Sequence, residues 1–291
     1  MRRLLERKKR RQPGIALRHD TAELASTYDK TSVHHLEHGK QLISALNIAS
    51  GETVLDIGAG TGHLAAHVAK IVGPSGYVVG MDPLPLRVEI AQSKAAGNFE
   101  ACVGRAEDLS QFPDASFDVV YLNSVFHWVE DKPRAITEIF RVLTPDGRFG
   151  LTCPDPTRPH EAFQFIQYAL TEAGAKHNRP MLGDDRLRRE RRHARLGLTD
   201  DELERLVTGA GFAAYESELW TVVNVYPDVD TLLASIESAS FGNFLVNSSE
   251  FFRARVRDAL DRLLEPKRLD DESIQLERYL IFATARKPRA V

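Results

Sequence analysis

The part of the chain best suited to bind a ligand is residues 54–62, VLDIGAGTG, where strand-forming residues lead into a glycine-rich turn that opens a helix. Glycine lets the backbone adopt positive φ and approach a ligand closely, and the free N–H groups at a helix start face that ligand. Asp82 follows Gly62 by 20 residues, at the end of the next expected strand. A carboxylate there can accept both hydroxyls of a ribose, so this spacing predicts a nucleotide-type cofactor.

Two details of this turn favour one class of cofactor over another. The dinucleotide-binding fingerprint has its third glycine where this chain has His63. Asp56 precedes the first glycine, Gly58, at the mouth of the strand. A buried carboxylate there would repel a pyrophosphate by several kcal/mol and attract a cation. S-adenosylmethionine carries an ammonium group and a sulfonium but no phosphate, and its ribose still needs Asp82, so the residues favour it over NAD.

The elements that would hold this turn follow the pattern of βαβ units. Candidate strands cover residues 53–57, 77–81, 98–103, 117–122 and 148–153, with two further β-like stretches at 216–225 and 276–283. Apolar residues recur at helical spacing between the first two strands and between the fourth and fifth, and another helix fits residues 199–211. This alternation predicts an α/β fold built on a mostly parallel sheet.

The chain divides by composition into a core and two insertions. We expect a basic tail at 1–20, a cofactor-binding core with N-terminal lid helices at 21–153, a return to the core at 199–226, and the last strand and tail at 272–291. Residues 154–198 and 227–271 are helix-like and rich in aromatic residues, and they would cover one end of the sheet. Core packing explains these aromatic residues at least as well as a substrate-lining role does.

Composition excludes several classes of protein. The chain has 291 residues, 43% of them hydrophobic, and a formal net charge of -3, which is typical of a globular protein and unlike a broad phosphate-backbone binder. Its apolar runs fall short of the roughly 20 residues that span a bilayer. The basic N-terminus lacks the apolar region of a secretory signal, and the two cysteines cannot form a disulfide scaffold. We therefore expect a cytoplasmic protein that does not enter membranes.

Residues 53–153 resemble the core of the class I S-adenosylmethionine-dependent methyltransferases. The matching motifs are VLDIGAGTG, VVGMD, GRAEDL and FDVVYLNSVFHWVEDKPRAITEIFRVLTPDGRFGLT. The similarity is to the broad small-molecule group that includes the ubiquinone/menaquinone and trans-aconitate methyltransferases. It implies a doubly wound, mostly parallel, seven-stranded Rossmann-like sheet with helical cap insertions. It also implies methyl transfer from S-adenosylmethionine to a small organic acceptor through an O, N, C or S atom.

The resemblance assigns cofactor-binding roles to particular positions. Four residues of the glycine turn would hold the methionine part, and Asp82 would hold the ribose. The complete set, with the adenine contacts, the residues beneath the cofactor and the lid, is Asp56, Gly58, Gly60, Gly62, Asp82, Pro83, Leu84, Ala106, Glu107, Asn123, Ser124, Tyr28 and Asp29. The chain departs from the family at Arg105, where an acidic residue often receives the adenine amino group, so the adenine contact stays open.

His127 is the candidate catalytic residue at the methyl group. A base is needed only when the acceptor holds its proton at neutral pH, as a hydroxyl does. His127 follows the fourth strand, and residues at the carboxyl end of that strand face the transferred methyl. The alternative is a structural histidine packed between Phe126 and Trp128.

Other constellations carry weaker signals. His34 and His38 have the i, i+4 spacing of zinc ligands, but no third ligand is evident, so we expect no metal and a polar helix face near the lid. Cys153 lies where RNA cytosine-5 methyltransferases have a nucleophile, but their proline-cysteine motif is missing. Two alternative functions remain open: an RNA methyltransferase that uses the basic tail and the run Arg186 to Arg195, and a non-catalytic S-adenosylmethionine-binding regulator.

Overall fold

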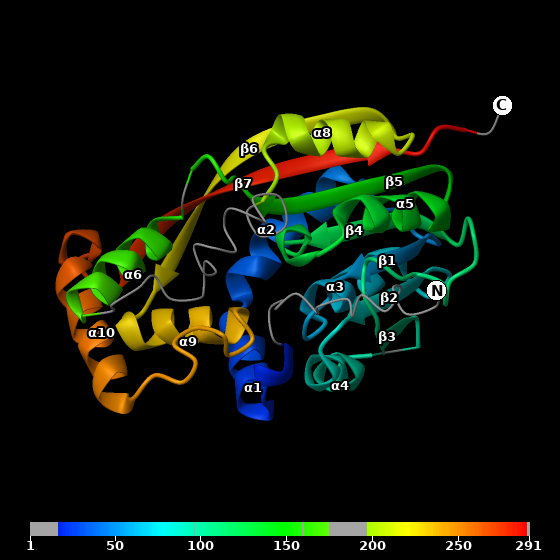
Figure 1. The fold of residues 1–291 in the computed structure, drawn as a ribbon. Helices are drawn as coiled ribbons and strands as arrows, with labels where there is room; N and C mark the ends of the chain where they lie inside the picture. Colours follow the sequence, from blue (N-terminus) through cyan, green and yellow to red (C-terminus); the bar gives the residue numbers. More distant parts are fainter. Residues whose placement is uncertain (1–16, 96, 159, 175–196, 290–291) are drawn as a thin grey trace, which may run out of the picture.

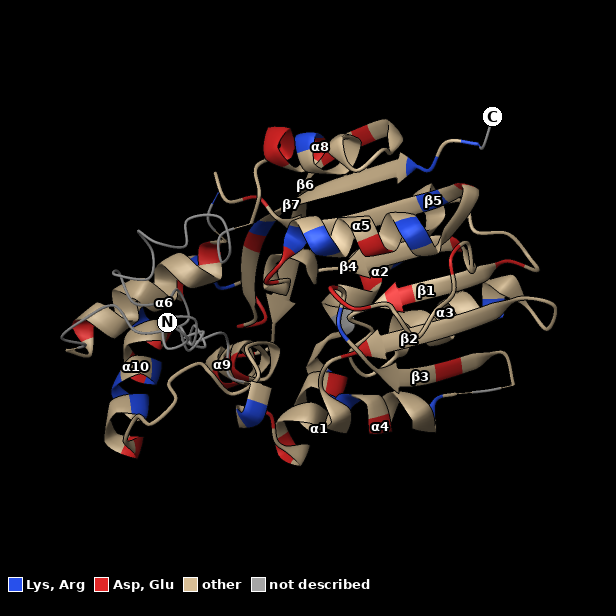
Figure 2. Cartoon of the chain, turned by 45° about the vertical axis from the view of Figure 1, so that its right-hand side comes forward, with Lys and Arg blue, Asp and Glu red and all other residues tan. Residues whose placement is uncertain are grey.

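The computed structural model describes residues 17–95, 97–158, 160–174 and 197–289 (Figure 1). The basic tail up to residue 16 and the basic run from Arg186 to Arg195 therefore lie outside the described residues. No helix in the described ranges is long and apolar enough to cross a membrane. The helices Lys132–Val142 (α5), Asp200–Gly209 (α8) and Glu250–Leu263 (α10) each carry acidic and basic side chains (Figure 2).

The described strands form one seven-stranded sheet in the order β3-β2-β1-β4-β5-β7-β6. Their bounds are β1 Thr53–Ile57, β2 Tyr77–Asp82, β3 Phe99–Val103, β4 Phe117–Asn123, β5 Leu143–Pro154, β6 Ala213–Tyr226 and β7 Ile274–Arg286. β1 to β5 pair in parallel, and β7 runs antiparallel to both β5 and β6. This sheet, with the family comparisons below, confirms the predicted doubly wound, mostly parallel Rossmann-like fold.

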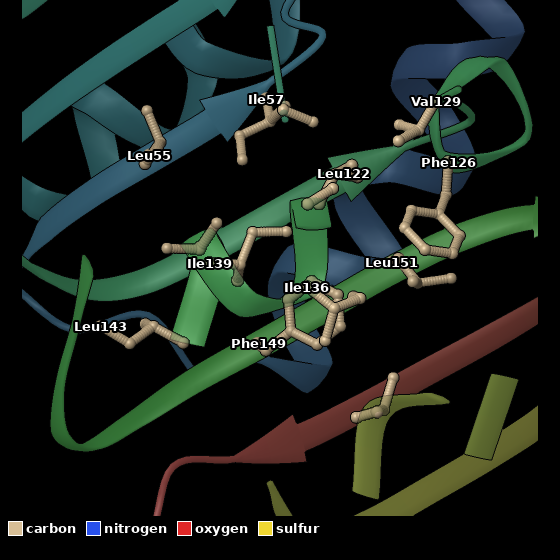
Figure 3. Packing of buried hydrophobic residues seen from close by; sticks show 14 of the residues in the cluster. Leu55, Ile57, Leu122, Phe126, Val129, Ile136, Ile139, Leu143, Phe149 and Leu151 are labelled. Carbon is tan, nitrogen blue, oxygen red and sulfur yellow. The ribbon is translucent and has the colours of Figure 1, made fainter. Parts of the chain in front are cut away.

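The helices cover both faces of the sheet. Their bounds are α1 Ala22–Thr31, α2 Val33–Ala45, α3 His63–Val72, α4 Pro85–Ser93, α5 Lys132–Val142, α6 Glu161–Glu172, α8 Asp200–Gly209, α9 Val229–Ala239 and α10 Glu250–Leu263, with short 3-10 turns at Leu17–His19, Phe126–Trp128 and Glu265–Lys267. Successive residues of a strand point to opposite faces. Val54 accordingly packs with α2, α3 and α4, and Leu55 packs with α5 and α8. Figure 3 shows Leu122, Ile136 and Phe149 gathered in the cluster on the α5 side.

Local sequence explains where these helices begin. α5 starts after Asp131, whose side chain accepts from the N–H of Arg134, and α8 starts with a capping box between Thr199 and Glu202. α3 starts directly at Gly62, so its first N–H groups open onto the glycine turn. The helix predicted at residues 199–211 is α8, Asp200–Gly209, and the helix predicted between the fourth and fifth strands is α5, Lys132–Val142.

A third apolar cluster lies at the far end of the β6–β7 ribbon, where α6, α9 and α10 pack together (Figure 1). β6 and β7 run beyond their predicted bounds, and their ends at Tyr226 and Ile274 enter this cluster. Phe163, Phe244 and Phe252 pack in or against it, which is the core-packing role expected for such residues. The division into core and cap insertions stays a proposal.

Candidate cofactor-binding site

The glycine turn adopts a conformation that only glycine fits. Gly58, Gly60 and Gly62 have φ of +79°, +56° and +82°. A Cβ on Gly58 would overlap Val125, and a Cβ on Gly60 would lie 3.0 Å from Cε1 of Tyr28. The N–H of Gly58 donates to the carbonyl of Met81 at 2.6 Å, which ties the turn to β2. The turn is therefore a cradle that leaves no room for a side chain.

Two buried carboxylates flank this cradle. Asp56 is 2% exposed and accepts a hydrogen bond from the Tyr121 hydroxyl at 2.8 Å. Asp82 is 7% exposed and accepts from the N–H groups of Gly60 and Leu84, both at 2.9 Å. Burial raises the pKa of Asp56 to about 7, against the Tyr121 hydrogen bond, and the charge of Asp82 raises it further. Burial also raises the pKa of Asp82.

This acid pair fits the cofactor inferred from the sequence. Within the described ranges, neither Asp56 nor Asp82 forms an ion pair with a lysine or arginine, so the site holds negative charge without a direct counter-charge. An ammonium group beside Asp56 would relieve the cost of its burial. A diphosphate would add to that cost.

Helix α1 closes over the turn. The Tyr28 ring lies against Gly60, its hydroxyl is 3.3 Å from Nδ1 of His35, and the Arg87 guanidinium stacks 4.1 Å from the ring centroid. Asp29 pairs with Nε2 of His63 at 2.8 Å and with Nζ of Lys94 at 2.7 Å. These contacts fasten α1 to α3 and to the C-terminal end of α4. The two residues expected in a lid thus lie directly over the cradle.

The closed α1 leaves a cavity of about 40 Å³ over the turn. It is lined by Tyr28, Ser32, His35, Leu36, Asp56, Gly58, Ala59, Thr61, His63, Leu64 and Asn123. The structure therefore brings four expected site residues around one space: Tyr28, Asp56, Gly58 and Asn123.

The expected adenine residues divide into two groups. Leu84 is buried beside Asp82, with Pro83 half-buried between them, and Ala106 is buried in the core cluster. The Glu107 carboxylate turns to the loop after the Phe126–Trp128 turn, where it accepts from the N–H of Glu130 at 2.8 Å. The side chain of Glu107 is thus already engaged, and its cofactor role stays a proposal.

Asn123 ends β4 and Ser124 follows it, and hydrogen bonds fix the positions of both residues. Nδ2 of Asn123 donates to the His35 carbonyl at 2.7 Å, and its Oδ1 accepts from the Thr152 hydroxyl at 2.8 Å. Ser124 has φ of +58°, and its N–H bonds to Thr152. Ser124 Oγ lies 3.0 Å from Nε2 of His38. The end of β4 is thereby joined to α2.

His127 sits in the Phe126–Trp128 turn, outside the lining of the small cavity. Its ring centroid is 4.8 Å from that of Trp128, and its buried Nδ1 has no hydrogen-bond partner in the described part of the chain. Burial, with the nearby charges of Lys132 and Arg278, lowers the pKa of His127 to about 3. The imidazole of His127 is therefore neutral at neutral pH, and its unprotonated nitrogen can accept a hydrogen bond.

The other sequence candidates take structural positions. Across the described residues, no three His, Cys, Asp or Glu side chains are placed to hold a metal ion. The histidines of α2 lie on one polar face of the helix, with His38 3% exposed and His34 and His35 partly exposed. Cys153 is 1% exposed, and burial raises its thiol pKa to about 12, so it is not a thiolate nucleophile at neutral pH.

Sequence reasoning missed two arginines, one buried and one partly buried. Arg87 pairs with Asp20 at 3.1 Å and donates to the Ser238 carbonyl at 2.6 Å, which joins α4 to the segments before α1 and in α9. Arg278 on β7 contacts α2 and the residue after β4. Both contacts join residues far apart in the sequence, so no local spacing predicts them. For Arg278, the available signal was a charged residue inside an apolar strand pattern.

A model of the methyltransferase domain family matches residues 55–151. The chain is 30% identical over 206 residues to the ubiquinone/menaquinone biosynthesis C-methyltransferase UbiE of Cronobacter sakazakii. The aligned region covers 69% of this chain and 70% of that protein. It is 35% identical over 138 residues to the nocamycin O-methyltransferase of Saccharothrix syringae, where the aligned region covers 46% of this chain and 49% of that protein. The chain spans about half the length of most curated relatives it matches.

The fold is similar to that of the phosphoethanolamine N-methyltransferase 2 of Haemonchus contortus, solved with S-adenosyl-L-methionine. The TM-score is 0.57 at 17% identity, covering 92% of this chain and 58% of that one, so this likeness concerns the fold alone. Fold and glycine turn define a Rossmann-like methyltransferase. With the relatives above, the chain belongs to the class I S-adenosylmethionine-dependent methyltransferases, and S-adenosylmethionine is the cofactor of that family. The resemblance seen in the sequence is confirmed.

Proposed function

We propose that this chain transfers the methyl group of S-adenosylmethionine to a small organic acceptor. The observation that carries the proposal is the glycine cradle between two buried carboxylates, Asp56 and Asp82. In this proposal Asp56, Gly58 and Gly60 hold the methionine part and Asp82 holds the ribose. Pro83, Leu84 and Ala106 lie on the adenine side, and Asn123 and Ser124 lie beneath.

Bound cofactor supplies a methyl group made electrophilic by its sulfonium. The protein then has to place a nucleophile in line with that methyl and exclude water, and such positioning can provide about 7–11 kcal/mol of the barrier. Tyr28 and α1 exclude water by covering the cradle. His127, held neutral by burial, would orient the acceptor through a hydrogen bond, because a pKa of about 3 makes its imidazole a weak base.

The acceptor in this proposal is a small molecule bound between the core and the cap helices α6, α9 and α10. Relatives named as a quinone C-methyltransferase and a nocamycin O-methyltransferase support a small-molecule acceptor. Charges of both signs on the described helices do not favour a nucleic acid. The free cysteines Cys102 and Cys153 fit a reducing, cytoplasmic compartment.

Calorimetry with S-adenosylhomocysteine tests the cofactor site. We expect micromolar binding by the wild type and at least a tenfold loss with Asp82→Ala. Asp108→Ala, which removes an exposed carboxylate from the neighbouring loop, is the matched control and should bind normally. Undiminished binding by Asp82→Ala would contradict the assignment. Turnover is followed by release of S-adenosylhomocysteine, and a protein that binds it but methylates nothing would support a regulator instead.

A further inference from the structure

Arg278 is a partly buried arginine of β7 without a carboxylate partner in the described part of the chain. Its Nη2 donates to Oγ of Ser124 at 3.1 Å and lies 3.3 Å from Nε2 of His38. Its Nη1 lies 3.4 Å from Nε2 of His35. Its Nε is buried and has no hydrogen-bond partner among the described residues. The guanidinium is therefore held by neutral groups and keeps unused donor capacity.

The surroundings of Arg278 carry no compensating charge. Burial, with the charge of Arg278, lowers the pKa of five histidines that face it: His34, His35, His38, His127 and His160. The remaining groups whose charge acts on Arg278 are the phenols of Tyr226 and Tyr28. Burial lowers the pKa of Arg278 itself to about 10, which leaves it a cation at neutral pH.

The imidazole orientations follow from this geometry. An arginine can only donate, so the Nε2 atoms of His35 and His38 must accept, which places the protons of both rings on Nδ1. Nδ1 of His35 then donates to the Tyr28 hydroxyl, while Nη2 of Arg278 donates to the Ser124 hydroxyl and that hydroxyl donates to the one lone pair on Nε2 of His38. The cluster is thus locked in one tautomer by the guanidinium, and these two rings have no free lone pair to act as bases.

Nearby carboxylates already have partners. Glu161 pairs with Lys267 at 2.6 Å and accepts from the N–H of Glu277 at 2.7 Å. Glu277 accepts from the Tyr279 hydroxyl at 3.1 Å. Asp56 accepts from the Tyr121 hydroxyl at 2.8 Å. None of these side chains neutralises Arg278.

The fully buried arginine of this fold has a carboxylate partner. Arg87 is 2% exposed and pairs with Asp20, whose side chain is 3% exposed. Arg278 is partly buried and has no such partner, so it loses hydration that no protein charge repays, and a ligand carboxylate can supply the missing charge. The contrast between the two arginines points to a ligand for Arg278.

Arg278 lies between the cofactor cavity and an open groove. His35 lines the small cavity over the glycine turn, whereas His38 lines a groove of about 640 Å³ between α2 and β6. Ser124, the hydroxyl partner of Arg278, directly follows Asn123, which lines the cofactor cavity. An anion on this guanidinium would therefore sit next to the bound cofactor without occupying its cradle.

We propose that Arg278 binds the carboxylate of an acidic methyl acceptor and so selects the substrate class. This inference rests on the proposed methyl-transfer function. A guanidinium presents two parallel N–H donors that match a carboxylate, and the His35–His38 pair fixes its plane. The two charges of the ternary complex are then each matched, with the cofactor ammonium at Asp56 and the acceptor carboxylate at Arg278. The cofactor's own carboxylate has the same chemistry, so the test must separate the two sources.

The first test compares Arg278→Met with Arg257→Met, a control in which an exposed, paired arginine of α10 receives the same substitution. Calorimetry with S-adenosylhomocysteine should give Kd values within threefold of the wild type for both variants. In thermal unfolding with saturating S-adenosylhomocysteine, acetate or benzoate should stabilise the wild type and Arg257→Met but not Arg278→Met. Acetamide and benzamide should have no effect on any of them.

The second test screens matched pairs of carboxylic acids and their primary amides for release of S-adenosylhomocysteine. We expect turnover of acids only, with kcat/KM lowered about 100-fold in Arg278→Met, or about 2.7 kcal/mol at roughly 1.36 kcal/mol per factor of ten. Arg278→Lys keeps the charge but not the pair of parallel donors, so its kcat/KM should lie between those of the wild type and Arg278→Met. This variant replaces Arg278→Met in the test if the Met variant does not fold.

Several outcomes overturn the assignment. One is weakened binding of S-adenosylhomocysteine in Arg278→Met with an intact response to benzoate, because it places the cofactor's carboxylate at this arginine. Another is turnover of amides at the rate of the acids, and a third is the absence of any stabilisation by either anion. Failure of the methyl-transfer function itself is recognised separately, since the wild type would then release no S-adenosylhomocysteine with any acid or amide, whereas failure of this assignment leaves turnover intact and removes only its dependence on Arg278.

Discussion

Replacing Asp56 by asparagine removes a buried charge and keeps an oxygen that can accept the hydrogen bond from Tyr121. Burial raises the pKa of this carboxyl from 3.8 to about 7. At about 1.4 kcal/mol per pKa unit, ionised Asp56 costs the folded protein about 4 kcal/mol without cofactor. The substitution is therefore expected to stabilise the cofactor-free protein at alkaline pH while it weakens cofactor binding.

The sign of the pH dependence follows from the direction of the shift. A carboxyl whose pKa is raised by folding contributes full stability below its unfolded pKa of 3.8 and loses that stability as pH rises toward 7. Between about pH 5 and pH 8, the free energy of unfolding of Asp56→Asn should rise relative to the wild type by about 2–3 kcal/mol. Comparing the two proteins at each pH cancels the buried histidines, whose lowered pKa values act in the opposite direction.

Urea unfolding at the two pH values measures this difference. Asp108→Asn, an exposed substitution, is the control and should follow the wild type at both. An Asp56→Asn variant whose stability tracks the wild type across the range would refute the argument that this carboxylate is buried without a counter-charge. Saturating S-adenosylhomocysteine should shrink the difference, because its ammonium group supplies that charge.

The remaining predictions concern the cradle and its cover. Gly60→Ala forces a side chain into a φ of +56° against Tyr28, so it should abolish detectable S-adenosylhomocysteine binding in calorimetry and cost about 1–3 kcal/mol of stability; normal binding would show that the turn tolerates a side chain. Arg87→Met leaves Asp20 buried and unpaired, so urea unfolding should show that the free energy of unfolding falls by about 3–5 kcal/mol. Arg278→Met removes an unpaired charge, so its free energy of unfolding should fall by less than half as much. Equal losses at the two arginines would contradict the distinction drawn between them.

The parallel core was predictable because its signals are local. Strand β1 and the glycine turn follow from short-range residue patterns, and the start of α5 follows from Asp131 and Pro133. The ribbon of β6 and β7 was predicted too short at both ends. Residues 213–215 and 284–286 are added at the end where β7 pairs with β5, and Tyr226, Ile274 and Gln275 are added at the end that enters the cap cluster. Both extensions depend on pairing and packing between distant segments, which no strand propensity encodes.

The site divides in the same way. Asp56 and Asp82 could be placed from the ends of two neighbouring parallel strands. The contacts of Arg278 with His35 and of Arg87 with Ser238 join residues separated by more than half the chain, so only the folded structure reveals them. The orientation of Glu107 toward Glu130 depends on the loop before α5, which sequence spacing does not specify.

The most direct test of the central claim is a pair of calorimetric titrations of the wild-type protein, one with S-adenosylhomocysteine and one with NAD. An acid at the mouth of β1 should accept the ammonium-bearing nucleoside with micromolar affinity and reject the diphosphate. Binding of NAD in the same range, or competition between the two ligands at equal concentrations, would contradict the account.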